Sequence, residues 1–197
     1  VLAVGGIMRE LAARGTRITI VAVTDGEASH PGSPSLTPSQ LVVLRAMERE
    51  RALARLDLDD ARIVRLGYPD GRVSAHRGLA SRLGPLVRDA SLVLAPWERD
   101  GHPDHDATGA AAVFAADLAG AQLMRYPVWA WHWAAPGDDA LPWKSVRRIP
   151  LAPATRAAKD LAIAEYTSQI TRHGRDEPVL PEAVLARFHR PYEVIFV

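Results

Sequence analysis

Short apolar runs alternate with longer segments of helical periodicity along most of the chain, and this order constrains the fold more than any other feature. Strands are expected over residues 17–24, 61–66, 91–95, 121–128, 146–149 and 192–197. Helices are expected over residues 1–14, 39–56, 78–89, 104–118 and 153–170. Because helices that connect strands favour parallel pairing, the pattern predicts an α/β fold with a mostly parallel sheet covered on both faces. A length of 197 residues fits one domain.

The composition narrows the classes of function. A formal net charge of +1 and scattered arginines do not indicate a nucleic-acid partner. The chain has no cysteine, so any metal must be held by histidine and carboxylate side chains. No apolar run reaches the about 18 residues that span a bilayer, and no basic segment precedes the apolar Val1–Gly6 to make a signal peptide. We therefore predict a cytoplasmic protein without a membrane span.

The first residues already follow helical spacing, with apolar side chains at Leu2, Ile7 and Leu11 and no initiator methionine. An α/β domain normally places a strand and a loop before such a helix. We expect that an N-terminal piece is absent from this numbering.

Ligands of such sheets bind beyond the carboxyl ends of the strands, which directs attention to the loops after Thr24, Leu66 and Ala95. The last of these loops leads into Asp100-Gly-His-Pro-Asp-His105, where a helix is expected to begin at Asp104. His102 and His105 can then both point into the crevice, and imidazole is a good ligand for zinc and similar divalent metals. The alternative is a polar loop whose aspartate is favoured by the helix dipole.

The segment Trp97–Thr108 resembles the second motif of the PIG-L/LmbE-like de-N-acetylases, metal-dependent enzymes that include N-acetylglucosaminyl deacetylases. Nearly the whole chain takes part in the resemblance. The further matches are Leu2–Gly6, Thr24–Glu27, the pair Arg45 and Glu48, the turn Tyr68–Gly71, and a late helix with Lys159, Tyr166, Ser168 and Gln169.

The resemblance implies a Rossmann-like, three-layer α/β/α fold and assigns roles by position. His105 matches the metal-ligating histidine, and His102 matches a histidine that acts electrostatically or as a general acid. Asp104, between them, is placed with His102 among the catalytic residues. Arg45 and Asp70 match positions that hold the substrate sugar.

The implied activity is hydrolysis of an N-acetyl group from an amino sugar or glycoconjugate, with zinc or another divalent metal and a metal-bound water as nucleophile. The family's first motif, His-Pro-Asp-Asp-Glu, should stand directly before Val1 and supplies two further ligands and the general base; it is absent from this sequence. Two alternatives stay open: a non-catalytic relative that acts as a binding or scaffolding protein, and a hydrolase of a non-sugar amide.

The substrate residues also have local explanations. Arg45 suits sugar hydroxyls or a phosphate, but it could form a helix-surface pair with Glu48. Asp70 lies in a Pro-Asp-Gly turn, where aspartate often serves local hydrogen bonding. Trp131 and His132, in an aromatic stretch, are expected to line the sugar or aglycone site, although a lid or a contact between copies in a homo-oligomer would explain them too.

Four further histidines lack partner spacing and are expected at the surface, namely His30, His76, His173 and His189. The loop 28–38, rich in Ser, Pro and Gly, is expected to be a poorly ordered rim.

Overall fold

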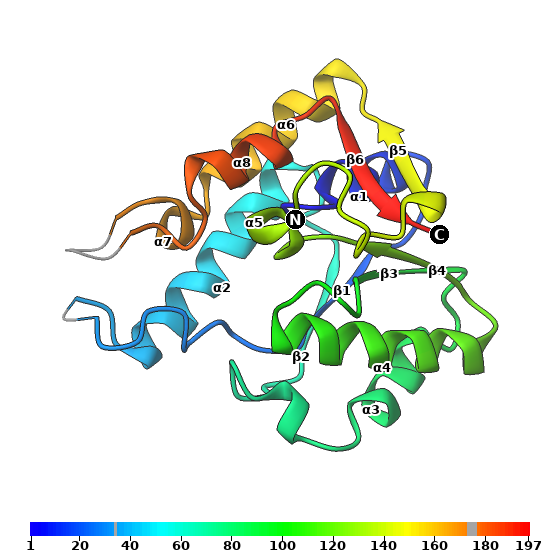
Figure 1. The fold of residues 1–197 in the computed structure, drawn as a ribbon, viewed down its shortest axis with the longest axis horizontal. Helices are drawn as coiled ribbons and strands as arrows, with labels where there is room; N and C mark the ends of the chain where they lie inside the picture. The colour runs from blue at the N-terminus through cyan, green and yellow to red at the C-terminus, as the bar shows by residue number, and fades with distance from the viewer. Residues whose placement is uncertain (34, 173–176) are drawn as a thin grey trace. The chain divides into compact units, whose positions relative to one another are not determined.

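The computed structural model describes residues 1–33, 35–172 and 177–197, and its chain path is shown in Figure 1. The longer helices are α1 (Gly5–Ala12), α2 (Pro38–Arg55), α3 (Leu79–Val87), α4 (Pro103–Ala119), α6 (Pro153–Ala164) and α8 (Glu182–Phe188). The short ones are α5 (Ala130–Trp133), α7 (Thr167–Ile170) and the 3₁₀ turns η1 (Val73–Ala75) and η2 (Trp143–Ser145). The strands are β1 (Thr19–Ala22), β2 (Arg62–Arg65), β3 (Leu92–Pro96), β4 (Gln122–Tyr126), β5 (Val146–Pro150) and β6 (Tyr192–Phe196).

The chain divides into two compact units, each of which is described by itself. The first unit contains Val1–Asp70 and Pro150–Glu193, and the second contains Gly71–Ile149 and Val194–Val197.

In the first unit, β1 and β2 pair in parallel, with Thr19 opposite Arg62 and Ala22 opposite Arg65. Helix α2 begins with a capping box, in which Thr37 and Gln40 bond each other's backbone amides. Helix α6 packs against both α1 and α2. Helix α2 contacts the loop that follows Thr24 through the hydrogen bond from Arg45 to Ser29.

A buried ion pair ties the ends of the first unit together. The two carboxylate oxygens of Glu193 each accept a hydrogen bond, from the backbone N–H of Gly6 and of Ile7, both at 2.8 Å. The same carboxylate lies 2.7 Å from Nζ of Lys159, and both side chains are almost fully buried. Burial lowers the pKa of Lys159, and Glu193 opposes that shift. The pair satisfies amides that a helix start would otherwise leave without partners.

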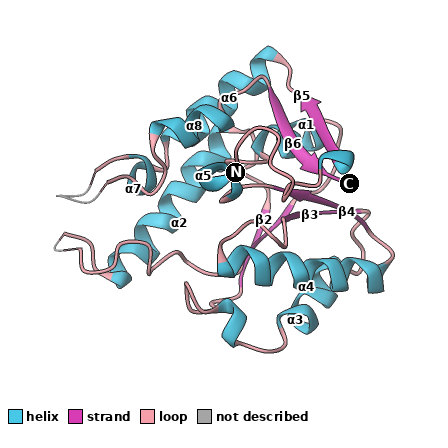
Figure 2. Ribbon diagram, in the orientation of Figure 1, coloured by secondary structure: helices cyan, strands magenta, loops and turns pink. Residues whose placement is uncertain are grey.

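In the second unit, the sheet has the strand order β3-β4-β6-β5. Strands β3 and β4 are parallel, with Leu92 opposite Gln122, whereas β4 and β6 are antiparallel. Helices α3 and α4 pack against each other, and α4 packs on β3 and β4, as Figure 2 shows. A small apolar core contains Trp97, Ala130, Leu141 and Phe196.

Helix α4 approaches β3 very closely at Gly109. A Cβ atom at this glycine would lie 2.5 Å from the carbonyl oxygen of Pro96 and 2.8 Å from the backbone nitrogen of Glu98. Only a residue without a side chain fits there, so this contact fixes the start of α4 against the end of β3.

The expected α/β class is confirmed, while the sheets are one parallel pair and one mixed sheet. The mostly parallel, three-layer, single-domain arrangement stays a prediction. The helix expected over residues 153–170 is interrupted after Ala164, and neither α5 nor α8 was expected from the sequence. No helix in the described part of the chain is both long enough and apolar enough to cross a membrane.

The surface prediction is wrong for His30, which is 8% exposed and bonds Ser29 through Nδ1. It is confirmed for His76, which is exposed. His189 is half-buried, with Nδ1 2.6 Å from Asp160. His173 lies outside the described residues, as does residue 34 of the loop 28–38, whose poor order stays a prediction.

Candidate functional site

The start of α4 positions His102 and His105, which both belong to the second unit. His102 is the N-cap residue, and its Nδ1 accepts a hydrogen bond from the backbone N–H of Asp104 at 3.2 Å. Pro103 occupies the first helical position, which its fixed φ suits. The preceding Gly101 has a φ of 87°, and a Cβ atom there would lie 2.7 Å from Nε1 of Trp133. The turn therefore requires glycine for two reasons.

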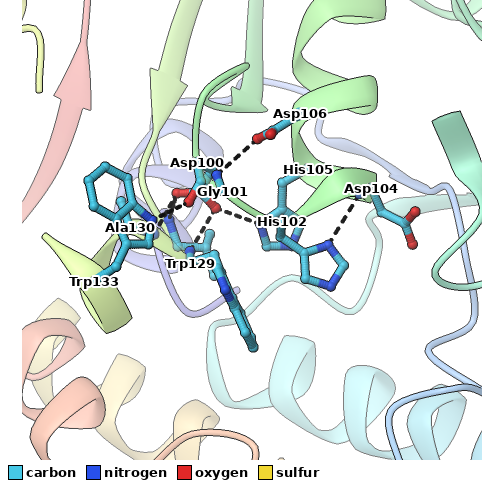
Figure 3. A network of polar contacts seen from close by, with 10 residues as sticks. Asp100, Gly101, His102, Asp104, His105, Asp106, Trp129, Ala130 and Trp133 are labelled. Carbon is cyan, nitrogen blue, oxygen red and sulfur yellow. Dashed lines mark hydrogen bonds and ion pairs between the residues drawn. The ribbon is translucent and has the colours of Figure 1, made fainter. Parts of the chain in front are cut away.

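Asp100 is fully buried. It lies at the centre of this network of polar contacts, as Figure 3 shows. Its Oδ1 accepts the N–H groups of Val128 and Ala130, both at 2.9 Å, and its Oδ2 accepts that of Trp129 at 2.6 Å. His105 completes the shell, with Nδ1 2.6 Å from Oδ2 of Asp100. Burial acts to raise the pKa of Asp100, but the hydrogen bonds from His105, Ala130 and Trp129 outweigh it and hold the pKa below its usual value.

The contact with Asp100 fixes the protonation pattern of His105. An ionised carboxylate only accepts hydrogen bonds, so Nδ1 of His105 carries a proton, and in the neutral ring Nε2 then keeps its lone pair. Metal-binding histidines usually donate their second ring N–H to a carboxylate or carbonyl in this way. His105 with Asp100 behind it therefore fits one ligand position of a zinc site. Within the described ranges no group of three or more His, Asp or Glu side chains could hold a metal.

The structure brings three of the predicted site residues together around Trp129. The ring centroids of His102 and His105 lie 4.6 Å apart, and His102 meets Trp129 edge-on at 5.2 Å. On α5, His132 stacks on Trp129 at 4.1 Å. Burial lowers the pKa of His132, which Asp100 opposes, and Nε2 of His132 is buried without a partner among the residues described. Trp131 is half-buried on the same short helix.

Asp104 is buried with both oxygens engaged. Its Oδ2 accepts the backbone N–H of Gly71 at 2.6 Å, and its Oδ1 accepts that of Val73 at 3.0 Å. These bonds tie the start of α4 to η1, in agreement with the packing of those two elements. The observed contacts of this side chain are structural.

Asp70, in the first unit, is likewise held by its neighbours. Its Oδ1 accepts from the hydroxyl of Thr24 at 2.9 Å, and its Oδ2 accepts from the backbone N–H of Ala28 at 3.0 Å. The backbone N–H of Asp70 donates to Oε1 of Glu27 at 2.9 Å. This exchange clamps the turn after β2 to the loop after β1.

Arg45 lies in the same unit and donates from Nη2 to the hydroxyl of Ser29 at 2.8 Å. Burial lowers the pKa of Arg45, against the opposing charges of Glu48, Asp70 and Tyr166. The helix-surface alternative for Arg45 and Glu48 is wrong, because Glu48 is 1% exposed. Its carboxylate instead accepts from Thr167 and from the backbone and hydroxyl of Ser168, at 2.6 to 2.9 Å.

The sequence did not single out Asp100 and Glu27, whose carboxylates anchor the neighbouring predicted residues His105 and Asp70. Asp100 stands at the head of the histidine motif, yet no sequence pattern links it to residues 128–130. Glu27 follows the expected strand end and closes the Thr24–Glu27 match to the family, and these were the available signals.

Comparison with known proteins gives a consistent result. The sequence profile of the GlcNAc-PI de-N-acetylase family, PIG-L, matches residues 1–116. The N,N'-diacetylchitobiose deacetylase from Pyrococcus horikoshii is 26% identical with a TM-score of 0.54, and the match covers 59% of this chain and 45% of that one. The match therefore spans less than half of that relative's length. No curated protein sequence matches the chain significantly.

Two further solved structures cover more of the chain. The conserved protein TT1542 from Thermus thermophilus is 27% identical with a TM-score of 0.66, over 94% of this chain and 78% of that one. The zinc-inhibited form of teicoplanin deacetylase Orf2 is 20% identical with a TM-score of 0.69, over 99% and 92%, a likeness of fold alone. Since the profile match spans more than half of the residues, this chain belongs to the GlcNAc-PI de-N-acetylase (PIG-L) family.

Proposed function

We propose that this protein is a metal-dependent de-N-acetylase that removes the N-acetyl group from an amino sugar or glycoconjugate. The observation that carries the proposal is the His105–Asp100 contact of 2.6 Å within the region that the family profile matches. The deacetylase that is 26% identical is named for diacetylchitobiose, an acetylated sugar, which favours the same substrate class.

His105 is proposed as a ligand of zinc or another divalent metal through Nε2. When bound, such a metal polarises an acyl carbonyl and lowers the pKa of water. The contribution of the chain itself is orientation: Asp100 fixes which ring nitrogen of His105 carries the proton and where the ring points.

His102 is proposed to act on the acyl oxygen. Because its Nδ1 accepts the N–H of Asp104, the neutral ring carries its proton on Nε2. An N–H donor held in place can stabilise the negative charge that develops on that oxygen, and its removal costs about 100-fold or more in rate in comparable sites. To serve instead as the acid for the leaving amine, His102 would have to carry a proton on Nδ1 as well, which requires release of the hydrogen bond from the Asp104 N–H. Asp104, the second residue predicted as catalytic, is proposed to act through the placement of this segment.

Arg45, Asp70, Trp131 and His132 are proposed to bind the sugar. Arg45 offers several donors in a planar fork, and the aromatic faces of residues 129–133 suit the apolar face of a pyranose. Cytoplasmic residence and a homo-oligomer remain predictions.

The test is acetate release from N-acetylglucosaminides by the natural full-length protein, with its metal content measured in the same samples. His105→Ala is expected to lose bound metal and activity together, and His102→Ala to keep the metal while losing turnover. Unchanged turnover in both variants would refute the mechanism. Full-length protein that neither binds a divalent metal nor releases acetate would favour a non-catalytic binding relative. Acetate release from simple amides but not from sugars would favour the non-sugar hydrolase.

A further inference from the structure

We propose that Glu27 and Arg49 join Arg45 in recognising an uncharged, hydroxyl-bearing face of the sugar, so that this part of the substrate carries no phosphate or carboxylate. The inference rests on the proposed function and adds two recognition residues and a charge class to it. We call Glu27, Arg45 and Arg49, all in the first unit, the α2 polar cluster.

Glu27 presents one anchored oxygen and one unused oxygen. Its Oε1 accepts the backbone N–H of Asp70 at 2.9 Å, which orients the carboxylate. Its Oε2 is buried and bonds nothing in the described part of the chain. A buried acceptor without a partner is uncommon in native proteins and calls for a specific explanation. A ligand hydroxyl that donates to Oε2 would provide it.

Arg45 and Arg49 supply the complementary donors. They lie one turn apart on α2 and so share a helix face. The Nε atoms of both are buried, again with no partner among residues 1–33, 35–172 and 177–197. Arg45 lies beside the loop that carries Glu27, because a Cβ atom at Gly26 would be 3.7 Å from its Nε and Cζ.

The electrostatic effects of Arg49 on a tyrosine and an aspartate agree with this placement. Burial raises the pKa of Tyr166, and the charges of Arg49 and Arg45 both act against that rise. The pKa of Asp25 is lowered mainly by its hydrogen bond with Arg65, and the charge of Arg49 adds to this effect. Arg49 thus acts on groups at both the strand end and the late helix of the first unit.

The other carboxylates nearby are already engaged. Asp70 uses both oxygens on Thr24 and Ala28, Glu48 bonds Thr167 and Ser168, and Asp25 pairs with Arg65. In the α2 polar cluster, three buried atoms have no partner among the described residues. They are the Nε donors of Arg45 and Arg49 and the acceptor Oε2 of Glu27.

This combination selects neutral hydroxyl groups. A hydroxyl donates and accepts at once, so adjacent sugar hydroxyls can satisfy Glu27 and the two arginines together. An anionic substituent would gain from the arginines but would be repelled by Oε2 of Glu27. An amino group would meet the reverse conflict. Specificity of this kind comes from the repulsive element as much as from the attractive one.

The test measures binding rather than turnover, with N-acetylglucosamine and N-acetylglucosamine 6-phosphate as probes in NMR titrations of the full-length protein. The wild type is expected to prefer the neutral sugar. Arg49→Met is expected to weaken neutral-sugar binding by about tenfold, the loss of one charge-assisted hydrogen bond. Glu27→Gln keeps an acceptor for the N–H of Asp70 but removes the negative charge. The ratio of the affinity for N-acetylglucosamine to that for its 6-phosphate should therefore fall, or the phosphate should become the better ligand.

Two comparisons keep the test decisive. Arg51→Met, at an exposed position of the same helix, should bind both probes like the wild type. Arg49→Lys, which retains the charge without the Nε donor, should also weaken neutral-sugar binding, so that a folding defect in Arg49→Met does not end the test. A wild-type preference for the phosphate, or Glu27 and Arg49 variants that match Arg51→Met, would overturn the inference. If the binding pattern holds but no acetate is released, the proposed activity fails and the α2 polar cluster stands.

Discussion

The Nδ1 atom of His105 lies 2.6 Å from Oδ2 of Asp100, and the same carboxylate accepts the backbone N–H groups of three consecutive residues, 128–130. One buried side chain therefore fixes both the ring of the proposed metal ligand and the start of the aromatic helix α5. We therefore expect the identity of residue 100 to affect the proposed metal ligand and the proposed sugar-binding segment together.

Asp100→Asn tests this relationship. The substituted amide removes the charge that orients the Nδ1–H of His105 and directs N–H groups at backbone donors. We expect metal affinity or deacetylase activity to fall by about 10- to 100-fold, as for other changes behind a metal ligand. Metal titration and acetate release on the same preparations measure the two effects.

Asp106→Asn is the matched control for Asp100→Asn. Asp106 belongs to the same motif, and its side chain accepts the N–H of Gly101 at 3.0 Å. Its variant should retain most of the metal affinity. Equal losses in the two variants would contradict a special role for Asp100.

Asp104→Asn should act on stability. Both oxygens of Asp104 accept backbone N–H groups, and an amide can accept only one of them. A buried donor left without a partner costs about 1–3 kcal/mol. Urea denaturation should show a loss of this size, and activity per folded molecule should fall only modestly. A stable but inactive variant would instead indicate a direct part in the chemistry.

Gly109→Ala probes the contact between α4 and β3. Its Cβ atom would fall within 2.5 Å of the Pro96 carbonyl oxygen, which requires the backbone to move. Overpacking typically costs about 1–3 kcal/mol, more than the up to about 1 kcal/mol that alanine gains over glycine in a helix. Thermal denaturation should show net destabilisation, whereas Ala110→Ser at the next, exposed position should change little. A Gly109→Ala protein as stable as the wild type would show that the two elements can separate.

Lys159→Met leaves Glu193 as a buried charge without its cation. Breaking such a pair from one side costs about 3–5 kcal/mol. Adding Glu193→Gln should recover part of that loss, because the amide is neutral and still accepts one of the two α1 amides. Denaturant titrations of the single and double variants measure the difference, with Arg156→Met as a surface control on the same helix. A double variant less stable than the single one would show that the charge of Glu193 is needed by α1 itself.

The Asp25–Arg65 pair predicts an acid-dependent loss of stability. The hydrogen bond from Arg65 lowers the pKa of Asp25 from its ordinary value of 3.8, although partial burial opposes the shift. The folded pKa is the lower one, so the contribution is complete above the unfolded value and is lost as pH falls through the folded value. Arg65→Met should therefore cost a little stability at pH 7, with a difference from the wild type that shrinks below about pH 4. A difference that persists unchanged at lower pH would attribute the loss to packing.

The sequence was informative wherever a signal was local. Helix α4 begins one residue before the expected Asp104, because Pro103 and the capping side chain of His102 are adjacent in the chain. The clustering of His102 with His105 follows from the same spacing.

Contacts between segments that lie far apart in the sequence could not be predicted in this way. The partners of Asp100 at residues 128–130 and those of Glu48 at Thr167 and Ser168 depend on how elements pack. Periodicity also does not give the direction of a strand, so the sequence could not predict that β6 lies antiparallel to β4. The burial of His30 has the same origin, since nothing in its neighbourhood distinguishes a packed imidazole from an exposed one.

The carboxylate of Asp100 binds residues 128–130 through hydrogen bonds from their backbone N–H groups and not through their side chains. Replacing Trp129 would therefore leave that attachment intact, provided that proline is avoided. Ala130 is an exception because it is completely buried. The aromatic residues of the segment 129–133, which we propose to bind the sugar, can consequently be substituted one at a time while this attachment stays unchanged. They are therefore the positions to vary in a search for variants with a different acyl-sugar preference.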